Sequence, residues 1–180
     1  MFVRLSAALA ALCLLSAPGF AQGGAKPTDP QIAHIAYTAG QLDIEAAKQA
    51  LAKSKNKEVR DFADQMVRDH TEVNKQALAL VEKLKVKPED NDTRRSLTKQ
   101  AAAKRDELAK LNDGAFDKAY VANEVAYHKT VNGALKSTLI PSASNFRRRA
   151  IPNSRACYKP AWKIFQGHQQ HAEHVAADVK

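Results

Sequence analysis

The clearest pattern in the chain is an apolar residue at every third or fourth position between Lys57 and Leu84. This spacing places the side chains on one face of an α-helix, and such a face must be buried against another element. Pro88 and the polar residues after it rule out a longer helix. The pattern therefore predicts a fold of packed helices, with inward positions at Val59, Phe62, Ala63, Met66, Val67, His70, Val73, Ala77, Leu80, Val81 and Leu84.

Four further segments are predicted to be helical, at 29–53, 93–111, 115–136 and 161–179. The first begins at Asp29-Pro30, because proline is tolerated in the first turn of a helix. The segment 93–111 is weakly apolar and heavily charged, so we expect it on the surface. No strand pattern of comparable length occurs, and the low aromatic content of 6% with abundant alanine suits closely packed helices. The sequence predicts an all-α fold, a four-helix bundle with one extra surface helix.

The N-terminus has the features of a secretory signal. Arg4 precedes an apolar run from Leu5 to Leu15, and small residues precede a cut after Ala21. The run is shorter than the roughly 20 residues that span a bilayer. We expect export to the periplasm or the outer membrane of a bacterium. The predicted organisation is a signal peptide at 1–21, a flexible lead at 22–28, and a helical bundle at 29–180 with an irregular basic segment at 141–160.

Several imidazoles and carboxylates fall on faces that should be apolar. His70 stands where a hydrocarbon residue is expected, and Glu124 and His128 continue the row begun by Phe116 and Tyr120. Side chains three or four residues apart share a helix face, so one helix can offer two ligands to one point. Carboxylates and histidines from up to four helices suit Zn²⁺, Fe or Cu. The candidate metal ligands are Glu45, His70, Glu124, His128, His168 and His171.

Each candidate also has a purely structural interpretation. His70 could complete a buried hydrogen-bond network with Tyr120 or Asn74. Glu124 and His128 could form an intrahelical pair worth a few tenths of a kcal/mol. Glu45 is at the edge of its inward face and could be a surface carboxylate. The sequence leaves both interpretations open.

Two blocks carry a resemblance to a known family: Phe62 to Asn74, and Gly114 to Tyr120 followed by His128. They resemble the exported bacterial family called domain of unknown function 4142 (DUF4142), whose members are similar to ferritin-like four-helix bundles and are often labelled outer-membrane or periplasmic proteins. The resemblance covers about 29–139 and 163–177. It implies that recurring family positions are matched by Glu45, Asp69, His70, Asp117, Tyr120, His128 and a histidine of the final helix.

The ferritin-like ligand pattern is only partly present. Ferritin-like metal proteins place a Glu on each of two helices and a Glu-x-x-His on each of the other two. Here Glu124 and His128 are spaced by four, and the second helix offers Asp69-His70 without a Glu-x-x-His. The sequence therefore does not predict a di-iron oxidase.

The segment 141–160 has no helical period and is bounded or interrupted by three prolines. It is either a genuine basic loop or the product of two compensating frameshifts, after which the ordinary pattern resumes at Ile164. Residues 145–163 hold six Lys or Arg and no acid, and so carry most of the net charge of +9. No recognition motif accompanies this charge, so we expect no nucleic-acid partner. Weak contact with an anionic membrane surface suits the segment better.

Catalytic motifs are absent from the sequence: there is no glycine-rich phosphate loop and no recognisable nucleophile context. Two classes of function remain. The first is a non-catalytic envelope protein that binds a metal, a small ligand or a partner, for example during stress. The second is a ferritin-like, metal-dependent oxidoreductase that uses the interior Glu/His cluster.

Overall fold

The computed structural model describes residues 28–83, 85, 87–134, 136 and 154–179, and within them every regular element is a helix. The all-α prediction is confirmed. The helices are α1 (Asp29–Lys53), α2 (Lys57–Lys83), α3 (Asp92–Ala109), α4 (Asp113–Ala134) and α6 (Ser154–Asp178). None of these helices is both long enough and apolar enough to cross a membrane.

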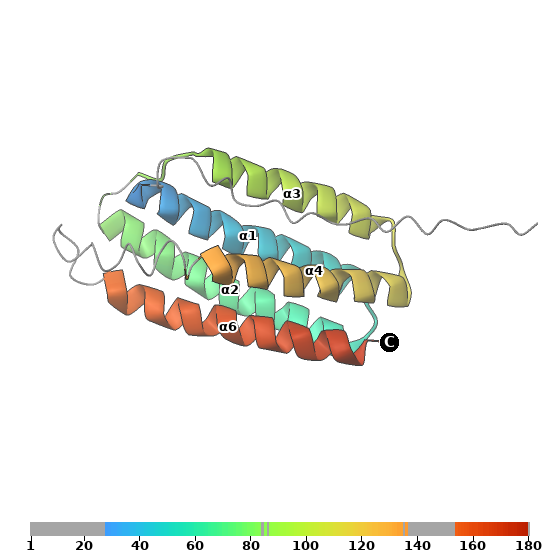
Figure 1. The fold of residues 1–180 in the computed structure, drawn as a ribbon. Coiled ribbons are helices and arrows are strands. Elements are labelled where there is room, and N and C mark those ends of the chain that lie inside the picture. The colour runs from blue at the N-terminus through green and yellow to red at the C-terminus, as the bar shows by residue number, and fades with distance from the viewer. Residues whose placement is uncertain (1–27, 84, 86, 135, 137–153, 180) are drawn as a thin grey trace, which may run out of the picture.

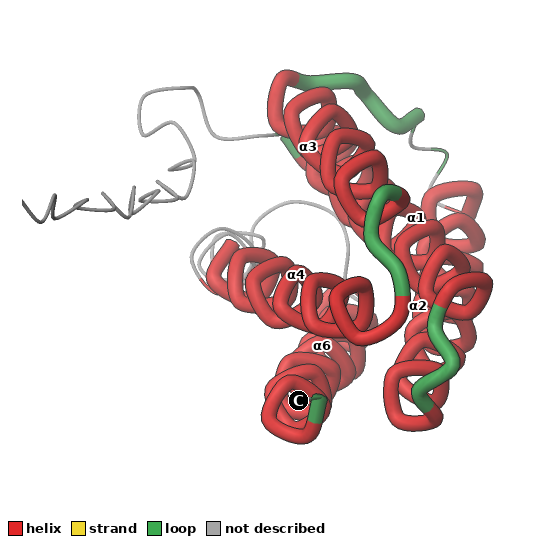
Figure 2. Tube along the Cα trace, turned by 90° about the vertical axis from the view of Figure 1, so that its right-hand side faces the viewer, coloured by secondary structure: helices red, strands yellow, loops and turns green. Residues whose placement is uncertain are grey.

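Four of the helices form a bundle, and the fifth lies outside it. Neighbouring pairs around the bundle are α1 with α2, α2 with α6, α6 with α4, and α4 with α1. Figure 2 looks along the helices and shows α3 outside this ring, where it packs mainly on α1. The segment predicted to lie on the surface therefore does so, apart from Leu108, which is buried.

Local sequence signals account for the first helix ends. Thr28 caps α1, and Thr28 and Gln31 exchange side-chain to backbone hydrogen bonds in a capping box. Only Ser54, Lys55 and Asn56 separate α1 from α2, so the two helices must run antiparallel. The Asn56 Oδ1 atom accepts hydrogen bonds from the backbone N–H groups of Glu58 (2.9 Å) and Val59 (3.3 Å), which satisfies donors in the first turn of α2.

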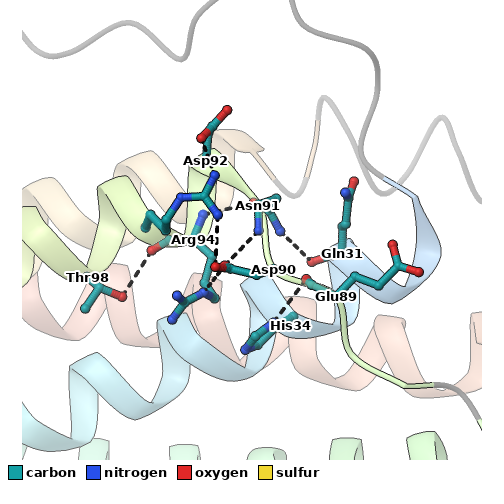
Figure 3. A network of polar contacts seen from close by, with 9 residues as sticks. Gln31, His34, Glu89, Asp90, Asn91, Asp92, Arg94 and Thr98 are labelled. Carbon is teal, nitrogen blue, oxygen red and sulfur yellow. Dashed lines mark hydrogen bonds and ion pairs between the residues drawn. The ribbon is translucent and has the colours of Figure 1, made fainter.

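A polar network fastens the start of α3 to α1 (Figure 3). Asn91 caps α3 by accepting from the backbone N–H of Arg94 at 2.9 Å. Its Nδ2 atom donates to the Gln31 carbonyl at 3.5 Å, and the Nδ1 atom of His34 lies 3.0 Å from the Glu89 carbonyl. These contacts tie the loop before α3 to the first two turns of α1.

The final helix begins earlier than predicted. The sequence prediction placed its start after Pro160, because proline lacks a backbone N–H, whereas α6 begins at Ser154. Adding turns to an already packed helix is favourable, which offsets the hydrogen bond lost at the proline. The predicted irregular segment 141–160 is therefore helical from Ser154 onward, and residues 141–153 lie outside the described residues. Leu84, Leu135 and the side chain of Leu80 also lie outside them.

The apolar core occupies the half of the bundle that contains the α1–α2 turn (Figure 1). Alanines with little or no exposure lie between the helices, so the backbones can approach closely. Larger side chains fill the remaining space and are led by Tyr120, Phe62, Phe116 and Met66. The predicted positions Val67, Val73 and Ala77 are only half-buried, at the margins of the inward face.

Candidate functional site

A polar layer replaces the apolar core near the middle of the four bundle helices. One helix contributes two side chains to it and each of the others contributes one, so all four bundle helices meet at this layer. Every member is 3% exposed or less. The members are Asp43 on α1, His70 on α2, Glu124 and His128 on α4, and His168 on α6.

Asp43 is the carboxylate at the centre of this layer. Its Oδ2 atom lies 2.7 Å from Nε2 of His70 and 3.3 Å from Nε2 of His128. None of these three atoms has an aligned hydrogen-bond partner, so the contacts are close electrostatic contacts rather than directed hydrogen bonds, and each is an ion pair only when its imidazole is protonated. One carboxylate thus joins α1 to α2 and α4.

The three histidines surround a common point. The ring centroids of His70 and His168 are 5.0 Å apart, those of His128 and His168 5.5 Å, and those of His70 and His128 6.1 Å. One nitrogen from each ring lies within 4.8 Å of one nitrogen from each of the others. A second group within the same limit consists of Asp43, Glu124 and His128. The two groups share His128.

The outer contacts of two histidines determine which ring nitrogen faces inward. His128 places Nδ1 2.9 Å from the Glu124 carbonyl, and His168 places Nε2 3.1 Å from Oδ2 of Asp69. A carbonyl or carboxylate oxygen only accepts, so these nitrogens carry the protons. The inner nitrogens, Nε2 of His128 and Nδ1 of His168, have no hydrogen-bond partner. In the neutral rings these atoms present lone pairs to the interior.

The two carboxyls of the layer are held in different protonation states. Burial raises the pKa of Asp43, but the charge of His70 and the contacts with His128 and His70 outweigh it and hold that pKa well below its usual value. Burial, and then the neighbouring Asp43 charge, raises the pKa of Glu124 well above its usual range. Asp43 is therefore an anion and Glu124 a neutral acid near neutral pH.

His168 is held in its neutral form. Burial lowers its pKa from 6.5 to about 4, against the opposing hydrogen bond to Asp69. A neutral imidazole is the form that binds a metal ion. The site therefore does not have to release a proton from His168 at neutral pH before this ring can act as a ligand.

Aromatic side chains flank the polar layer. Phe165 stacks on the His70 ring, with centroids 5.2 Å apart and planes 15° from parallel. Tyr120 is fully buried and its hydroxyl has no hydrogen-bond partner. Burial and the nearby charges of Glu124 and Asp43 raise the pKa of Tyr120 well above 10. These aromatic side chains give the layer surroundings of low polarity, which strengthens the electrostatic interactions between its members.

Four of the six residues predicted as ligands come together in this layer: His70, Glu124, His128 and His168. Glu45 lies elsewhere, because its carboxylate is 2.8 Å from Nη1 of Arg105 on α3 and is 41% exposed. His171 also lies outside, with Nδ1 2.7 Å from Oε1 of Gln65. Its ring packs edge-on against Phe62.

Asp43 is the member that the sequence interpretation missed. It lies two positions before Glu45, and a step of two on a helix points to a different face. The available signal was its spacing of three, four and seven residues from Ala46, Ala47 and Ala50, all of which are buried. A carboxylate on a helix face of buried alanines indicates a buried polar site in the same way as His70 does on the apolar face of α2.

Two further residues singled out by the family resemblance are not members of the layer. Asp69 contacts His168 from the outside. Asp117 is buried one turn before Tyr120, and its Oδ1 atom has no hydrogen-bond partner.

The comparisons with known proteins identify a family and assign it no chemistry. Residues 15–175 match the family described as "Domain of unknown function (DUF4142)". No curated protein and no solved structure matches the chain. Because the match covers most of the sequence, the chain belongs to the DUF4142 family.

Proposed function

We propose that this chain is an exported bacterial envelope protein, periplasmic or associated with the outer membrane, whose bundle binds one transition-metal ion without catalysis. His70, His128 and His168 are the primary ligands, and Asp43 completes the set. The observation that carries the proposal is that the inner nitrogens of His128 and His168 have no aligned hydrogen-bond donor, while the first of them lies 3.3 Å from the Asp43 carboxylate. Metal-binding histidines ordinarily donate the outer N–H to a carboxylate or a carbonyl, as these two do.

The donor set agrees with the metals considered from the sequence. Imidazole nitrogens suit Zn²⁺, Cu and Fe, and a carboxylate is an accepted fourth ligand for Zn²⁺. Ligand atoms about 2.0–2.1 Å from a tetrahedral ion are roughly 3.3 Å apart. The nitrogens lie within 4.8 Å of one another, so small rotations of the rings are enough to close the site.

A binding role is favoured over turnover by the burial of the site. All five polar side chains are 3% exposed or less, and a substrate would have to reach the ion through packed helices. Burial favours slow release of an ion, which suits storage, buffering or a structural role. It does not suit an open coordination position that exchanges substrate with solvent.

A metal-dependent oxidoreductase is the second candidate, and one observation favours it. Asp43 and Glu124 bring two carboxyls to the ring of His128, which adds ligands that suit iron or manganese. Such an enzyme would show a spectral change that depends on oxygen or peroxide, whereas a binding protein would not.

Metal analysis of the mature protein, purified without a histidine tag, tests the proposal. We expect about one equivalent of metal in the wild type and loss of that metal in His70→Ala and in His128→Ala. The matched controls are His174→Ala, which removes a histidine that is 76% exposed, and Glu45→Gln, which removes a carboxylate outside the layer. Both controls should keep the metal.

Circular dichroism of each variant separates loss of the ligand from loss of the fold. The proposal is wrong if the folded wild type retains no metal after exposure to Zn²⁺, Cu²⁺ and Fe²⁺. It is also wrong if the controls lose metal to the same extent as the two ligand variants, because binding would then not depend on the layer.

A further inference from the structure

The buried polar layer is connected through His168 to a carboxylate that is partly exposed to solvent. Four of its members, Asp43, His70, Glu124 and His128, have side chains that are 4% exposed or less, and their ion-pair partners are one another. His168 is 1% exposed but contacts Asp69, whose side chain is 24% exposed. The Asp69 carboxylate thus stands between solvent and a proposed metal ligand.

Asp69 lies where α2 packs against α6, and these two helices run side by side in both views (Figures 1 and 2). Gln65 donates from Nε2 to Oδ2 of Asp69 at 3.2 Å. The Oε1 atom of the same Gln65 lies 2.7 Å from Nδ1 of His171. Asp69, Gln65 and His171 therefore form a hydrogen-bonded row along this seam, outside His168.

The ion pair on the outer side of Asp69 is weak enough to be displaced. Arg68 donates from Nε to Oδ1 of Asp69 at 3.0 Å, and its side chain is 70% exposed. Exposed pairs of this kind contribute about 0–1 kcal/mol, so a divalent cation can replace the guanidinium at the carboxylate.

A second contact between the layer and a half-buried residue is less suited to a cation. Asn123 donates from Nδ2 to Oε1 of Glu124 at 3.2 Å. An amide N–H₂ group carries partial positive charge, so it does not attract a metal ion. Of these two approaches, the Asp69 side alone offers a negative charge to the incoming ion.

We propose that metal enters and leaves through the α2–α6 seam, with Asp69 as the entry ligand and His168 as the ligand that carries the ion inward. This inference rests on the proposed metal-binding function. A hydrated cation first binds the Asp69 carboxylate in place of Arg68. The His168 ring then turns, which breaks the contact between its Nε2–H and Asp69 and brings the unprotonated Nδ1 atom to the ion. Rotation back delivers the ion to His70 and His128, and the Nε2 proton stays on the ring throughout. Release follows the same path in reverse.

An entry ligand differs measurably from a residue that only orients His168. A group on the path speeds both entry and exit, so its removal slows both and leaves the dissociation constant nearly unchanged. A carboxylate that only orients a ligand stabilises the bound ion, so its removal speeds release, typically with a 10–100-fold loss of affinity. The ratio of the two rates therefore identifies the role of Asp69.

The experiment is stopped-flow loading of the metal-free protein with Co²⁺, followed by release to an excess of chelator, both read by the visible absorption of the bound ion. We expect Asp69→Asn to slow loading and release by about tenfold or more, within the range of electrostatic effects on association. Asp69→Glu, which keeps the carboxylate, should restore most of both rates. The matched control is Asp64→Asn, which removes the same charge from an exposed position on α2.

Three results would overturn the inference. Unchanged loading with faster release in Asp69→Asn would make Asp69 a positioning residue. Equal slowing in Asp69→Asn and Asp64→Asn would mean that the effect is general attraction by negative charge. Absence of binding of Co²⁺, and of Zn²⁺, Cu²⁺ and Fe²⁺ as well, by the folded wild type would overturn the proposed function too, whereas the first two results would leave it intact.

Discussion

Nε2 of His70 and Oδ2 of Asp43 are 2.7 Å apart, and both side chains are buried between α1 and α2. A buried pair of this kind contributes little net stability, because removing two charges from water costs about as much as their attraction returns. Removing one partner is much worse, because the other remains buried without compensation. The pair therefore makes the fold depend on a contact that the proposed metal would also use.

Asp43→Asn should destabilise the metal-free protein by about 3 kcal/mol at neutral pH, because it removes the anion beside two imidazoles at nearly constant volume. The folded pKa of Asp43 is depressed, so its stabilisation is present above the unfolded pKa of about 3.9 and is lost as pH falls further. Urea denaturation with chelator present measures the effect. The difference between wild type and variant should shrink below about pH 4, and a constant difference down to pH 2 would contradict this account.

Glu124→Gln should stabilise the metal-free protein at neutral pH. The raised pKa of Glu124 means that the folded state holds a proton that the unfolded chain releases. Its stability contribution is complete below the unfolded pKa of about 4.3 and is lost as pH rises toward the folded pKa, by up to about 1.4 kcal/mol per pH unit. Denaturation curves of the two proteins should agree near pH 4, and the variant should be the more stable at pH 7. Equal stability at both pH values would show that Glu124 is ionised in the fold.

The helices were predictable because their signals are local. Apolar spacing and the Pro30 start signal located α1 and α2 to within one residue. The start of α6 was not predictable from Pro160 alone, because packing farther along a helix can offset a local breaker. The positions of the alanines and histidines in the sequence also indicate which half of the bundle is apolar and which contains the polar layer.

The candidate site was only partly predictable because it depends on rotation about each helix axis. His70, His128 and His168 could be found from their places on apolar faces. Glu45 was predicted because it lies at the edge of the expected apolar stripe. Asp43 is two positions away, about 200° around the helix, and it is the carboxylate that is buried. The contact between His168 and Asp69 joins positions 99 residues apart, and no spacing rule along the sequence predicts it.

His168→Gln should remove a pH dependence from the stability of the metal-free protein. The folded pKa of about 4 lies below the ordinary value of 6.5, so the unfolded state binds a proton in this window and the folded state does not. Stability should therefore fall as pH drops from about 6.5 to about 4, by roughly 3 kcal/mol in total. Glutamine keeps an N–H donor near Asp69 but does not titrate.

The stability contribution of Glu124 changes with pH in the opposite direction over part of the range from pH 4 to pH 6.5. The effect of His168→Gln should therefore be measured in a Glu124→Gln background. Denaturation curves of that variant with and without His168→Gln, collected every half pH unit, isolate the histidine. Curves that stay parallel from pH 7 to pH 4 would mean that His168 titrates in the fold as it does in the unfolded chain.

Gly40 and Asn74 mark a close approach of α1 to α2 and give a prediction that is independent of the metal. A Cβ atom on Gly40 would lie 2.6 Å from Oδ1 of Asn74, which is buried. Alanine is otherwise favoured over glycine in a helix by about 1 kcal/mol. Gly40→Ala should therefore destabilise the wild type by about 1–2 kcal/mol through overpacking.

The same substitution should become stabilising, by up to about 1 kcal/mol, when Asn74→Ala removes the obstructing amide. Gly133→Ala is the control, because a Cβ atom there has no neighbour within 4 Å. It should stabilise both backgrounds equally. Urea denaturation of the four proteins in this double-mutant cycle measures the coupling between Gly40 and Asn74. Additive effects at the two positions would mean that Asn74 moves aside at no cost, and that the close packing of α1 on α2 does not depend on the glycine.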